Sequence, residues 1–133
     1  SQIDFGPVSS AGKVAGHEAI RINPADAACR RLQDGDVVRV FNDRGACLAG
    51  VVIDANVLEK VAVMATGAWF DPPGSAGGPG RHGNPNVLTI DVGTSPLTQG
   101  SSALSALVEI ERWQGGDSPM QAWTPPRLLA SGR

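Results

Sequence analysis

The chain has 133 residues, of which 41% are hydrophobic and 18% charged, and its formal net charge is -2. This length suits one domain with a sizeable core and is tight for two domains. Near-neutral charge without a basic stripe excludes electrostatic capture of nucleic acid, and no apolar run is long enough to insert into a membrane. The 17 glycines and 10 prolines favour a turn-rich globular domain over a helical bundle.

The first part of the chain predicts a lead-in, a strand and a helix. Residues 1–16 are polar and rich in glycine, and we interpret them as irregular. Residues 19–23 alternate between apolar and polar side chains, as a half-buried strand does. Asn23 is a typical helix cap before Pro24, so a helix of about two to three turns should follow and end at Gly35.

The following segments predict strands and little further helix. Residues 37–42 and 46–54 should pair as a hairpin. Residues 61–66 have the composition of a buried strand, residues 87–90 of a short strand, and residues 104–111 alternate clearly. This pattern is typical of a mainly β barrel or sandwich with short helical inserts.

Two connections are long for so small a domain. Residues 67–85 and 93–103 flank the same predicted strand, so both are expected to face one surface. Within the first, residues 74–83 are interpreted as a floppy insertion. From residue 113 onward we expect a tail that lies over another part of the protein or is partly disordered.

The residues that could ligate metals or perform catalysis are scattered. Cys29 and Cys47 form no CxxC pair and are expected to be small buried or semi-buried hydrophobic residues, with nothing to support a disulfide between them. His17 and His82 are solitary, so we expect no metal site. The serines have no local base and no GxSxG turn, and residues 74–83 lack the ending of a phosphate-binding loop, so we predict no catalytic residue.

Binding is the better prospect, because the long connections are rich in side chains that both donate and accept hydrogen bonds. Such groups suit a flat heterocycle or a phosphate without requiring positive charge. Gly93 and Gly100 would let the backbone approach a ligand closely. The alternative is that these side chains cap turns and satisfy one another, and composition alone leaves both open. They are Asn84, Asn86, Thr89, Thr94, Ser95, Thr98 and Gln99.

Several segments, in order, resemble a known family. They are AGHEAIRINPADAACRRLQDGDVVRVFNDRGACLAG, TGAWFDP, NPNVLTIDVGTSPLTQG and ALVEIE, of which the third is the most specific. Together they resemble the C-terminal domain of molybdenum oxidoreductases, in the group that reduces dimethyl sulfoxide, trimethylamine N-oxide and biotin sulfoxide. The similarity covers roughly residues 1–112.

The resemblance implies a fold, a cofactor and partners. The fold would be a double-psi β-barrel of the aspartate-decarboxylase type over residues 1–112, followed by a C-terminal tail over residues 113–133. The cofactor would be bis(molybdopterin guanine dinucleotide), shared with the remaining domains of a parent reductase that removes oxygen from an N-oxide or S-oxide. The metal's protein ligand would lie elsewhere in that reductase. Because the chain begins with Ser1, we expect it to be a piece of such a longer protein, in the bacterial periplasm or cytoplasm.

The resemblance also implies residues that contact the cofactor. Ser1, Gln2 and Ile3 match the end of an LHSQ-like segment, and Asn86 matches the asparagine of the NVLT motif. Trp69 matches an aromatic position in the preceding loop. Where relatives often have arginine in a GRE-like turn, this chain has His17. The remaining matches, all within the third segment, are Thr89, Gln99 and Gly100.

Two other functions are alternatives to this one. Double-psi barrels also serve as substrate-recognition modules without a cofactor, but such a module has no use for the NPNVLT and GTSPLTQG segments. An autonomous decarboxylase-like enzyme would need a self-processing Gly-Ser site with supporting residues, and we find none. The sequence does not identify the substrate or the electron donor.

Overall fold

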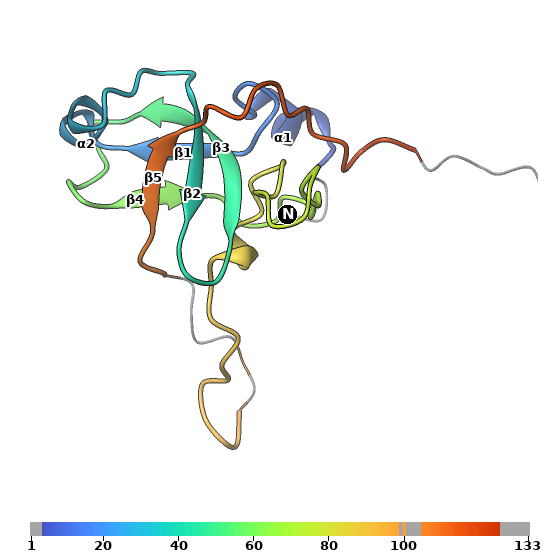
Figure 1. Ribbon diagram of the computed structural model, residues 1–133. Coiled ribbons are helices and arrows are strands. Elements are labelled where there is room, and N and C mark those ends of the chain that lie inside the picture. Colours follow the sequence, from blue (N-terminus) through green and yellow to red (C-terminus); the bar gives the residue numbers. More distant parts are fainter. Residues whose placement is uncertain (1–3, 99, 101–104, 126–133) are drawn as a thin grey trace, which may run out of the picture.

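In a computed structural model that describes residues 4–98, 100 and 105–125, the chain is mainly β and is built around one mixed sheet (Figure 1). The strand order is β4-β1-β3-β2-β5. The prediction of a mainly β domain with short helices is therefore confirmed. The sheet is open, with β4 at one edge and β5 at the other.

The central strands follow the predicted alternation closely. β2 (Val37–Phe41) and β3 (Ala46–Ile53) form the expected antiparallel hairpin, with Val38 opposite Ala49 and Val40 opposite Cys47. β1 (Ala19–Ile22) lies parallel to β3. This parallel pair requires a crossover, and α2 (Pro24–Cys29) lies within it.

The two edge strands are short. β4 (Ala62–Met64) pairs with β1, and β5 (Glu109–Arg112) pairs with β2, both antiparallel. The composition of residues 61–66 predicted a buried strand; the strand is present as β4, but its burial is wrong, because Val63 is 48% exposed. Only the last part of the predicted strand 104–111 is in the sheet.

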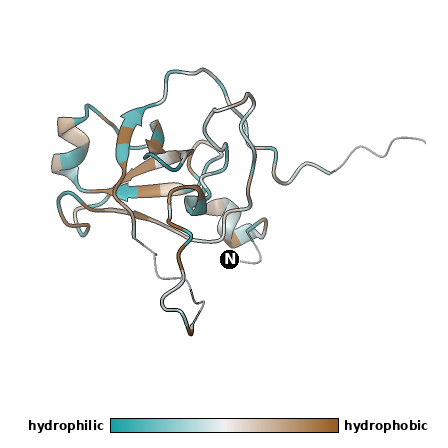
Figure 2. Cartoon of the chain, turned by 60° about the horizontal axis from the view of Figure 1, so that its bottom comes forward, coloured by the Kyte–Doolittle hydropathy of each residue, from teal (hydrophilic) through white to brown (hydrophobic). Residues whose placement is uncertain are grey.

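The core lies where the inward side chains of β1, β2 and β3 meet. These residues, together with Ala27 of α2 and Leu32, are at most 4% exposed. In Figure 2 brown residues lie on the strands, and brown segments also occur on the loops that leave the sheet. Within the described residues, no helix is long and apolar enough to cross a membrane.

The N-terminal helices differ from the prediction. The lead-in is not irregular throughout, because α1 (Pro7–Ala11) forms with Pro7 at its first turn. α2 begins after Asn23, whose side chain accepts from the Ala25 amide at 2.8 Å, as expected for the cap. It ends at Cys29 and not at Gly35, because Arg31 adopts a left-handed conformation with φ of 56°.

The predicted strand at residues 87–90 is also wrong. A 3-10 helix, η1 (Pro85–Val87), begins there instead, because the Asn84 side chain caps the turn and Pro85 starts it. The stretch 74–83 is not a floppy insertion throughout. Gly80 forms a parallel bridge with Cys47 of β3, and its amide donates to the Ala46 carbonyl at 2.9 Å.

Candidate functional site

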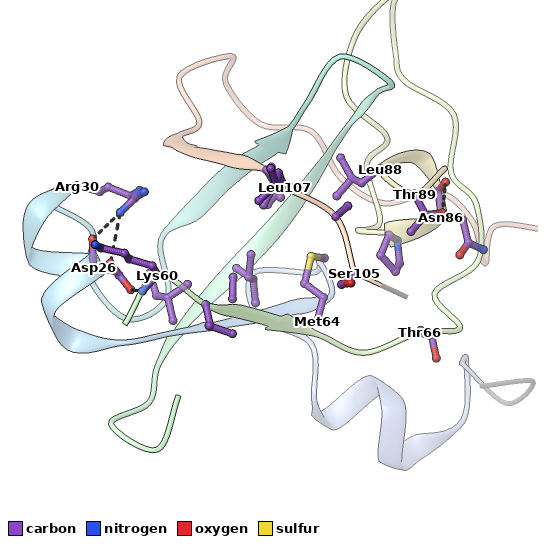
Figure 3. A pocket seen from close by; sticks show the side chains of 18 residues that line it. Asp26, Arg30, Lys60, Met64, Thr66, Asn86, Leu88, Thr89, Ser105 and Leu107 are labelled. Carbon is purple, nitrogen blue, oxygen red and sulfur yellow. Dashed lines mark hydrogen bonds and ion pairs between the residues drawn. The ribbon is translucent and has the colours of Figure 1, made fainter. Parts of the chain in front are cut away.

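A groove of about 560 Å³ lies between β4 and the segment 105–108. β4 lines one side, and residues 105–108, directly before β5, line the other (Figure 3). Ile20, Ile22 and Val40 of the core reach its floor. The remaining lining residues are Asp26, Arg30, Lys60, Val61, Ala62, Met64, Thr66, Pro85, Asn86, Leu88, Thr89, Ser105, Ala106, Leu107 and Val108.

The groove is apolar in the middle and polar at its two ends (Figure 3). At one end the side chains are charged: Arg30 Nη1 lies 3.8 Å from Asp26 Oδ1, and the Lys60 backbone amide donates to Asp26 Oδ2 at 2.6 Å. The other end, formed by uncharged residues, includes Asn86 and Thr89. That second end is the part of the groove with hydrogen-bonding groups suited to a neutral heterocycle.

The turn at the second end presents an asparagine to solvent. The Asn86 amide N–H donates to Asn84 Oδ1 at 2.9 Å, and Thr89 Oγ1 donates to the Asn86 carbonyl at 3.2 Å. Leu88, only 4% exposed, anchors the turn in the core. The Asn86 side chain is exposed, so its carboxamide faces outward from a backbone fixed on both sides.

Asn42, after β2, holds both rims of the groove. Its Nδ2 donates to the Leu88 carbonyl at 2.9 Å and to the Leu107 carbonyl at 3.2 Å. Its Oδ1 accepts from the Gly45 amide at 3.3 Å. A Cβ at Gly45 would lie 2.6 Å from the Val87 carbonyl oxygen, so this close approach requires glycine. Sequence reasoning missed Asn42, which resembles any other turn asparagine.

The second polar loop satisfies its own hydrogen bonds. The Thr94 amide donates to the Gly100 carbonyl at 3.1 Å, and Thr94 Oγ1 donates to the Thr98 carbonyl at 2.9 Å. The loop extends away from the sheet, whereas Gly80 of the first long connection packs along β3 (Figure 1). The self-satisfying alternative is therefore observed for this loop. Gln99 lies outside the described residues.

Trp69 belongs to a different surface. Its ring stacks on Phe5 with centroids 6.3 Å apart, and its amide donates to Asp4 Oδ2 at 3.3 Å. Neither Trp69 nor Gly100 lines the groove. Of the described residues expected to contact a cofactor, the groove therefore brings together Asn86 and Thr89. The candidates Ser1, Gln2 and Ile3 lie outside the described residues.

Away from the groove, six charged or titratable side chains form what we call the ionic cluster. Lys13 Nζ lies 2.7 Å from Asp4 Oδ1 and 2.5 Å from Glu18 Oε2. Arg81 Nη2 lies 2.9 Å from Asp71 Oδ1. Most of these side chains are buried, and their charges are paired within the chain. The cluster consists of Asp4, Lys13, Glu18, Asp71, Arg81 and His82.

Burial sets the protonation of the two histidines. Burial and the nearby Lys13 charge lower the pKa of His82, whose Nδ1 contacts the Trp69 carbonyl at 3.0 Å. Burial likewise lowers the pKa of His17, which contacts the Arg81 carbonyl. For Asp4, burial would raise the pKa, but hydrogen bonds from Lys13 and the Trp69 amide outweigh it, and the pKa is lowered. Both histidines are therefore neutral structural residues.

The chain after β5 returns to the ionic cluster. The amides of Gln121 and Ala122 donate to Asp71 Oδ2. Trp123 Nε1 donates to Asp4 Oδ2 at 3.2 Å, and its ring packs edge-on against His82 with centroids 5.4 Å apart. Residues 121–123 therefore lie over the cluster and not over the groove.

The cysteines have different environments. Cys47 is buried, and burial raises the pKa of its thiol to about 12. Cys29 is exposed, contrary to the expectation of a buried or semi-buried residue, because α2 turns it away from the core. Both are free thiols. In the part of the chain that the structure describes, no group of three or more His, Cys, Asp or Glu residues is placed to hold a metal ion.

Comparison with known proteins supports the resemblance. The family described as Molydopterin dinucleotide binding domain matches residues 1–107. Trimethylamine-N-oxide reductase 1 of Escherichia coli K12 is 53% identical over 77% of this chain and 12% of its own length. Biotin sulfoxide reductase of Cereibacter sphaeroides is 46% identical over 86% of this chain and 15% of its own length. Dimethyl sulfoxide/trimethylamine N-oxide reductase of Cereibacter sphaeroides is 42% identical, over 86% and 14%. The chain thus spans about one seventh of these relatives.

Proposed function

The chain belongs to the molybdopterin dinucleotide binding domain family, and from this premise we propose that it is the cofactor-binding domain of a molybdenum-dependent reductase. Its substrate class is N-oxides or S-oxides, the class that the names of its relatives indicate. The match of the family over residues 1–107 is the observation on which the proposal rests.

The polar end of the groove fits such a cofactor chemically. A pterin or guanine edge carries adjacent donors and acceptors, and the exposed Asn86 carboxamide offers one of each. Asn84 and Thr89 hold the backbone N–H and carbonyl of Asn86, so the position from which its side chain extends is fixed before the ligand arrives. The apolar middle of the groove does not suit a charged dinucleotide. Within the groove, we therefore assign contact with the cofactor to the polar end only.

When bound, the molybdenum cofactor supplies the oxygen-atom transfer. The residues of this chain bind and orient it: Asn86 hydrogen-bonds a heterocycle edge, and Thr89 holds the Asn86 carbonyl in place. Asn42 holds the neighbouring Leu88 carbonyl and so keeps the turn against the sheet. None of these residues exchanges a proton with the substrate in this proposal.

The finer details of the proposal extend beyond the groove. The cofactor is the bis(molybdopterin guanine dinucleotide) form, and the open sheet is part of a double-psi β-barrel over residues 1–112, followed by a tail over residues 113–133. The remaining domains of the parent reductase supply the metal ligand and the other walls of the site. Further contacts with the cofactor are assigned to Ser1, Gln2, Ile3, Trp69, Gln99 and Gly100.

The test uses the complete reductase and a matched pair of variants. Asn86→Ala is expected to reduce the molybdenum and pterin bound per protein, because one donor and one acceptor to the cofactor are lost. Asn56→Ala, at an exposed turn outside the groove, is the control and should retain the full content. Equal molybdenum and pterin content in both variants would overturn the assignment of Asn86.

A further inference from the structure

The turn that joins β2 and β3 packs against the segment that carries Asn86 (Figure 1). The first turn spans residues 42–45, and the second spans residues 84–89 and is called the Asn86 turn here. A Cβ at Gly45 would lie 2.6 Å from the Val87 carbonyl oxygen, so the two backbones approach each other closely. The end of the central hairpin therefore helps to set where the Asn86 turn lies.

One backbone carbonyl connects the two turns. Among the described residues, the hydrogen bonds that tie the Asn86 turn to the rest of the chain both end on the Leu88 carbonyl oxygen. Asn42 Nδ2 donates to this oxygen at 2.9 Å, and Arg44 Nε donates to it at 2.9 Å. A carbonyl oxygen has two lone pairs, so the peptide of Leu88 is held by two donors at once.

The ordered position of Arg44 is explained by this bond. An arginine on an exposed turn loses much rotamer freedom when it is held in one place. Arg44 Nη1 also lies 3.4 Å from Asp43 Oδ1, but the Asp43 side chain is 86% exposed, and such surface pairs contribute little. A charged donor forms a stronger hydrogen bond than a neutral one, so the Leu88 carbonyl is the main partner of Arg44.

The hold on the Leu88 carbonyl extends to Asn86 through Thr89. The peptide between Leu88 and Thr89 is planar, so fixing the carbonyl also fixes the backbone nitrogen of Thr89. Thr89 Oγ1 in turn donates to the Asn86 carbonyl at 3.2 Å. The backbone from which the Asn86 side chain extends therefore depends on Arg44, although the two side chains belong to different turns.

We infer that Arg44 is a positioning residue for the cofactor, because it holds the Asn86 turn in place through the Leu88 carbonyl. The inference rests on the proposed function in one respect, namely that Asn86 contacts the heterocycle of the cofactor. Arg44 itself contacts neither the cofactor nor the reacting atoms. It restricts the motion of the Asn86 turn before the cofactor binds, so that less freedom is lost on binding.

Two substitutions at Arg44 separate its hydrogen bond from its charge and its bulk. Glutamine has an amide nitrogen as many bonds from the backbone as arginine Nε, so Arg44→Gln retains a donor toward Leu88 and loses the charge. Methionine has a methyl group at that position, so Arg44→Met retains the length of the side chain and loses the donor. Arg39→Met is the control, because Arg39 lies on β2 and pairs with Glu111 outside the groove.

Amide hydrogen exchange in the cofactor-free complete reductase measures the hold on the turn. In Arg44→Met, the amides of residues 86–89 are expected to exchange about 10-fold faster, because one of the two hydrogen bonds to the turn is lost. Arg44→Gln and Arg39→Met should exchange at the rate of the unsubstituted protein, and β3 should stay protected in all three. Unchanged exchange in Arg44→Met would overturn the inference, and so would loss of β3 protection, which would indicate a role in overall stability.

The rate at which the loaded reductase releases its cofactor gives a readout that a purely structural role would not change. Molybdenum and pterin should be lost about 10-fold faster from Arg44→Met, and Arg44→Gln should restore the slow rate. Equally fast loss from both variants would show that the charge is what matters and would overturn the inference.

The positioning role and the proposed function fail in different ways. If Asn86→Ala lowers the cofactor content but Arg44→Met releases the cofactor at the normal rate, the positioning role is wrong and the contact of Asn86 stands. If Asn86→Ala leaves the cofactor content unchanged, the contact of Asn86 is wrong and the positioning role is overturned with it. Exchange at residues 86–89 of the cofactor-free protein still shows in that case whether Arg44 holds the turn.

Discussion

The ionic cluster and the groove are two regions of one small domain with different chemistry: the cluster consists of paired charges, and the groove is mainly apolar. In the cluster, Lys13 has carboxylate partners on two sides, and Arg81 lies against Asp71. The groove has an apolar floor between β4 and residues 105–108, and the Leu107 side chain on its rim is exposed to solvent. The cluster is completed from within the chain, by residues as far apart as Asp4 and Trp123.

This difference separates the stability of the chain from its function. Changing the cluster should unfold the chain, because buried charges would lose their partners. Changing the polar end of the groove should affect what binds there and leave the fold in place. The substitutions below test that separation, from the largest expected effect to the smallest.

Asp71→Ala should have the largest effect. The substitution removes the partner of the Arg81 guanidinium and the acceptor of two backbone amides, at a side chain that is 2% exposed. The free energy of unfolding should fall by about 3–5 kcal/mol, as for other buried pairs that lose one partner. Urea unfolding of both proteins measures this difference in the free energy of unfolding. A change below about 1 kcal/mol, typical of an exposed pair, would mean that the cluster does not hold the fold.

Asn42→Ala, at the rims of the groove, should have an intermediate effect on stability and should also affect cofactor binding. The carbonyls of Leu88 and Leu107 lose a donor, which should cost about 1–3 kcal/mol of unfolding free energy. The same change removes one of two side chains that hold the turn of Asn86, since Arg44 Nε still donates to the Leu88 carbonyl at 2.9 Å, so cofactor content should fall in part. Asn42→Asp retains the acceptor for the Gly45 amide and loses the donor. Cofactor content equal to that of the unsubstituted protein in both variants would show that Asn42 has only a structural role.

Acidification should destabilise the cluster before it affects the groove. The pKa values of His17 and His82 are lowered in the fold from 6.5, so the folded state binds fewer protons than the unfolded state as the pH falls below 6.5. Stability present above this pH is then lost as the pH falls through the lowered values. Asp4, with a pKa lowered from 3.8, adds a second loss below 3.8.

Thermal unfolding midpoints across this pH range measure the effect. His82→Gln should reduce the loss of stability between pH 6.5 and the acid limb near 3.8. An identical pH profile in the variant would contradict the assignment of the neutral His82 ring to the cluster.

Glu111→Gln should have the smallest effect. Its carboxylate lies 3.0 Å from Arg39 Nη1 on the exposed surface of β5, where water screens the pair. The expected loss is below about 1 kcal/mol. Because Arg39 also lies over the Phe41 ring at 4.1 Å, the guanidinium keeps a partner. A loss equal to that of Asp71→Ala would remove the distinction between buried and exposed pairs in this domain.

Local signals predicted the centre of the fold well. The alternation at residues 37–42 and 46–54 predicted the hairpin, since one face of each strand is buried. Asn23 and Pro24 predicted the start of α2. The end of that helix was missed because Arg31 adopts a positive φ that no residue type announces. Residues 87–90 were mistaken for a strand because Asn84 caps a turn just before them.

Neither region of the comparison was visible as a whole in the sequence. His82 and Asp4 are 78 positions apart, and Trp123, still further along the chain, contacts both of them. Asn86 and Thr89 were identified through the resemblance, and polar composition alone did not separate them from Thr94 and Thr98, which satisfy their own loop. Val63 on the edge strand β4 is exposed, but an apolar residue in a strand is predicted to be buried when only composition is considered.

The most direct test of the cofactor assignment is amide exchange at residues 84–90 of the complete reductase, measured with and without the molybdenum cofactor. The account predicts that these amides are protected at least ~10-fold more in the loaded protein, while β3 and residues 105–108 exchange equally in both forms. Equal exchange at residues 84–90 in the two forms would contradict the placement of the cofactor at the Asn86 end of the groove.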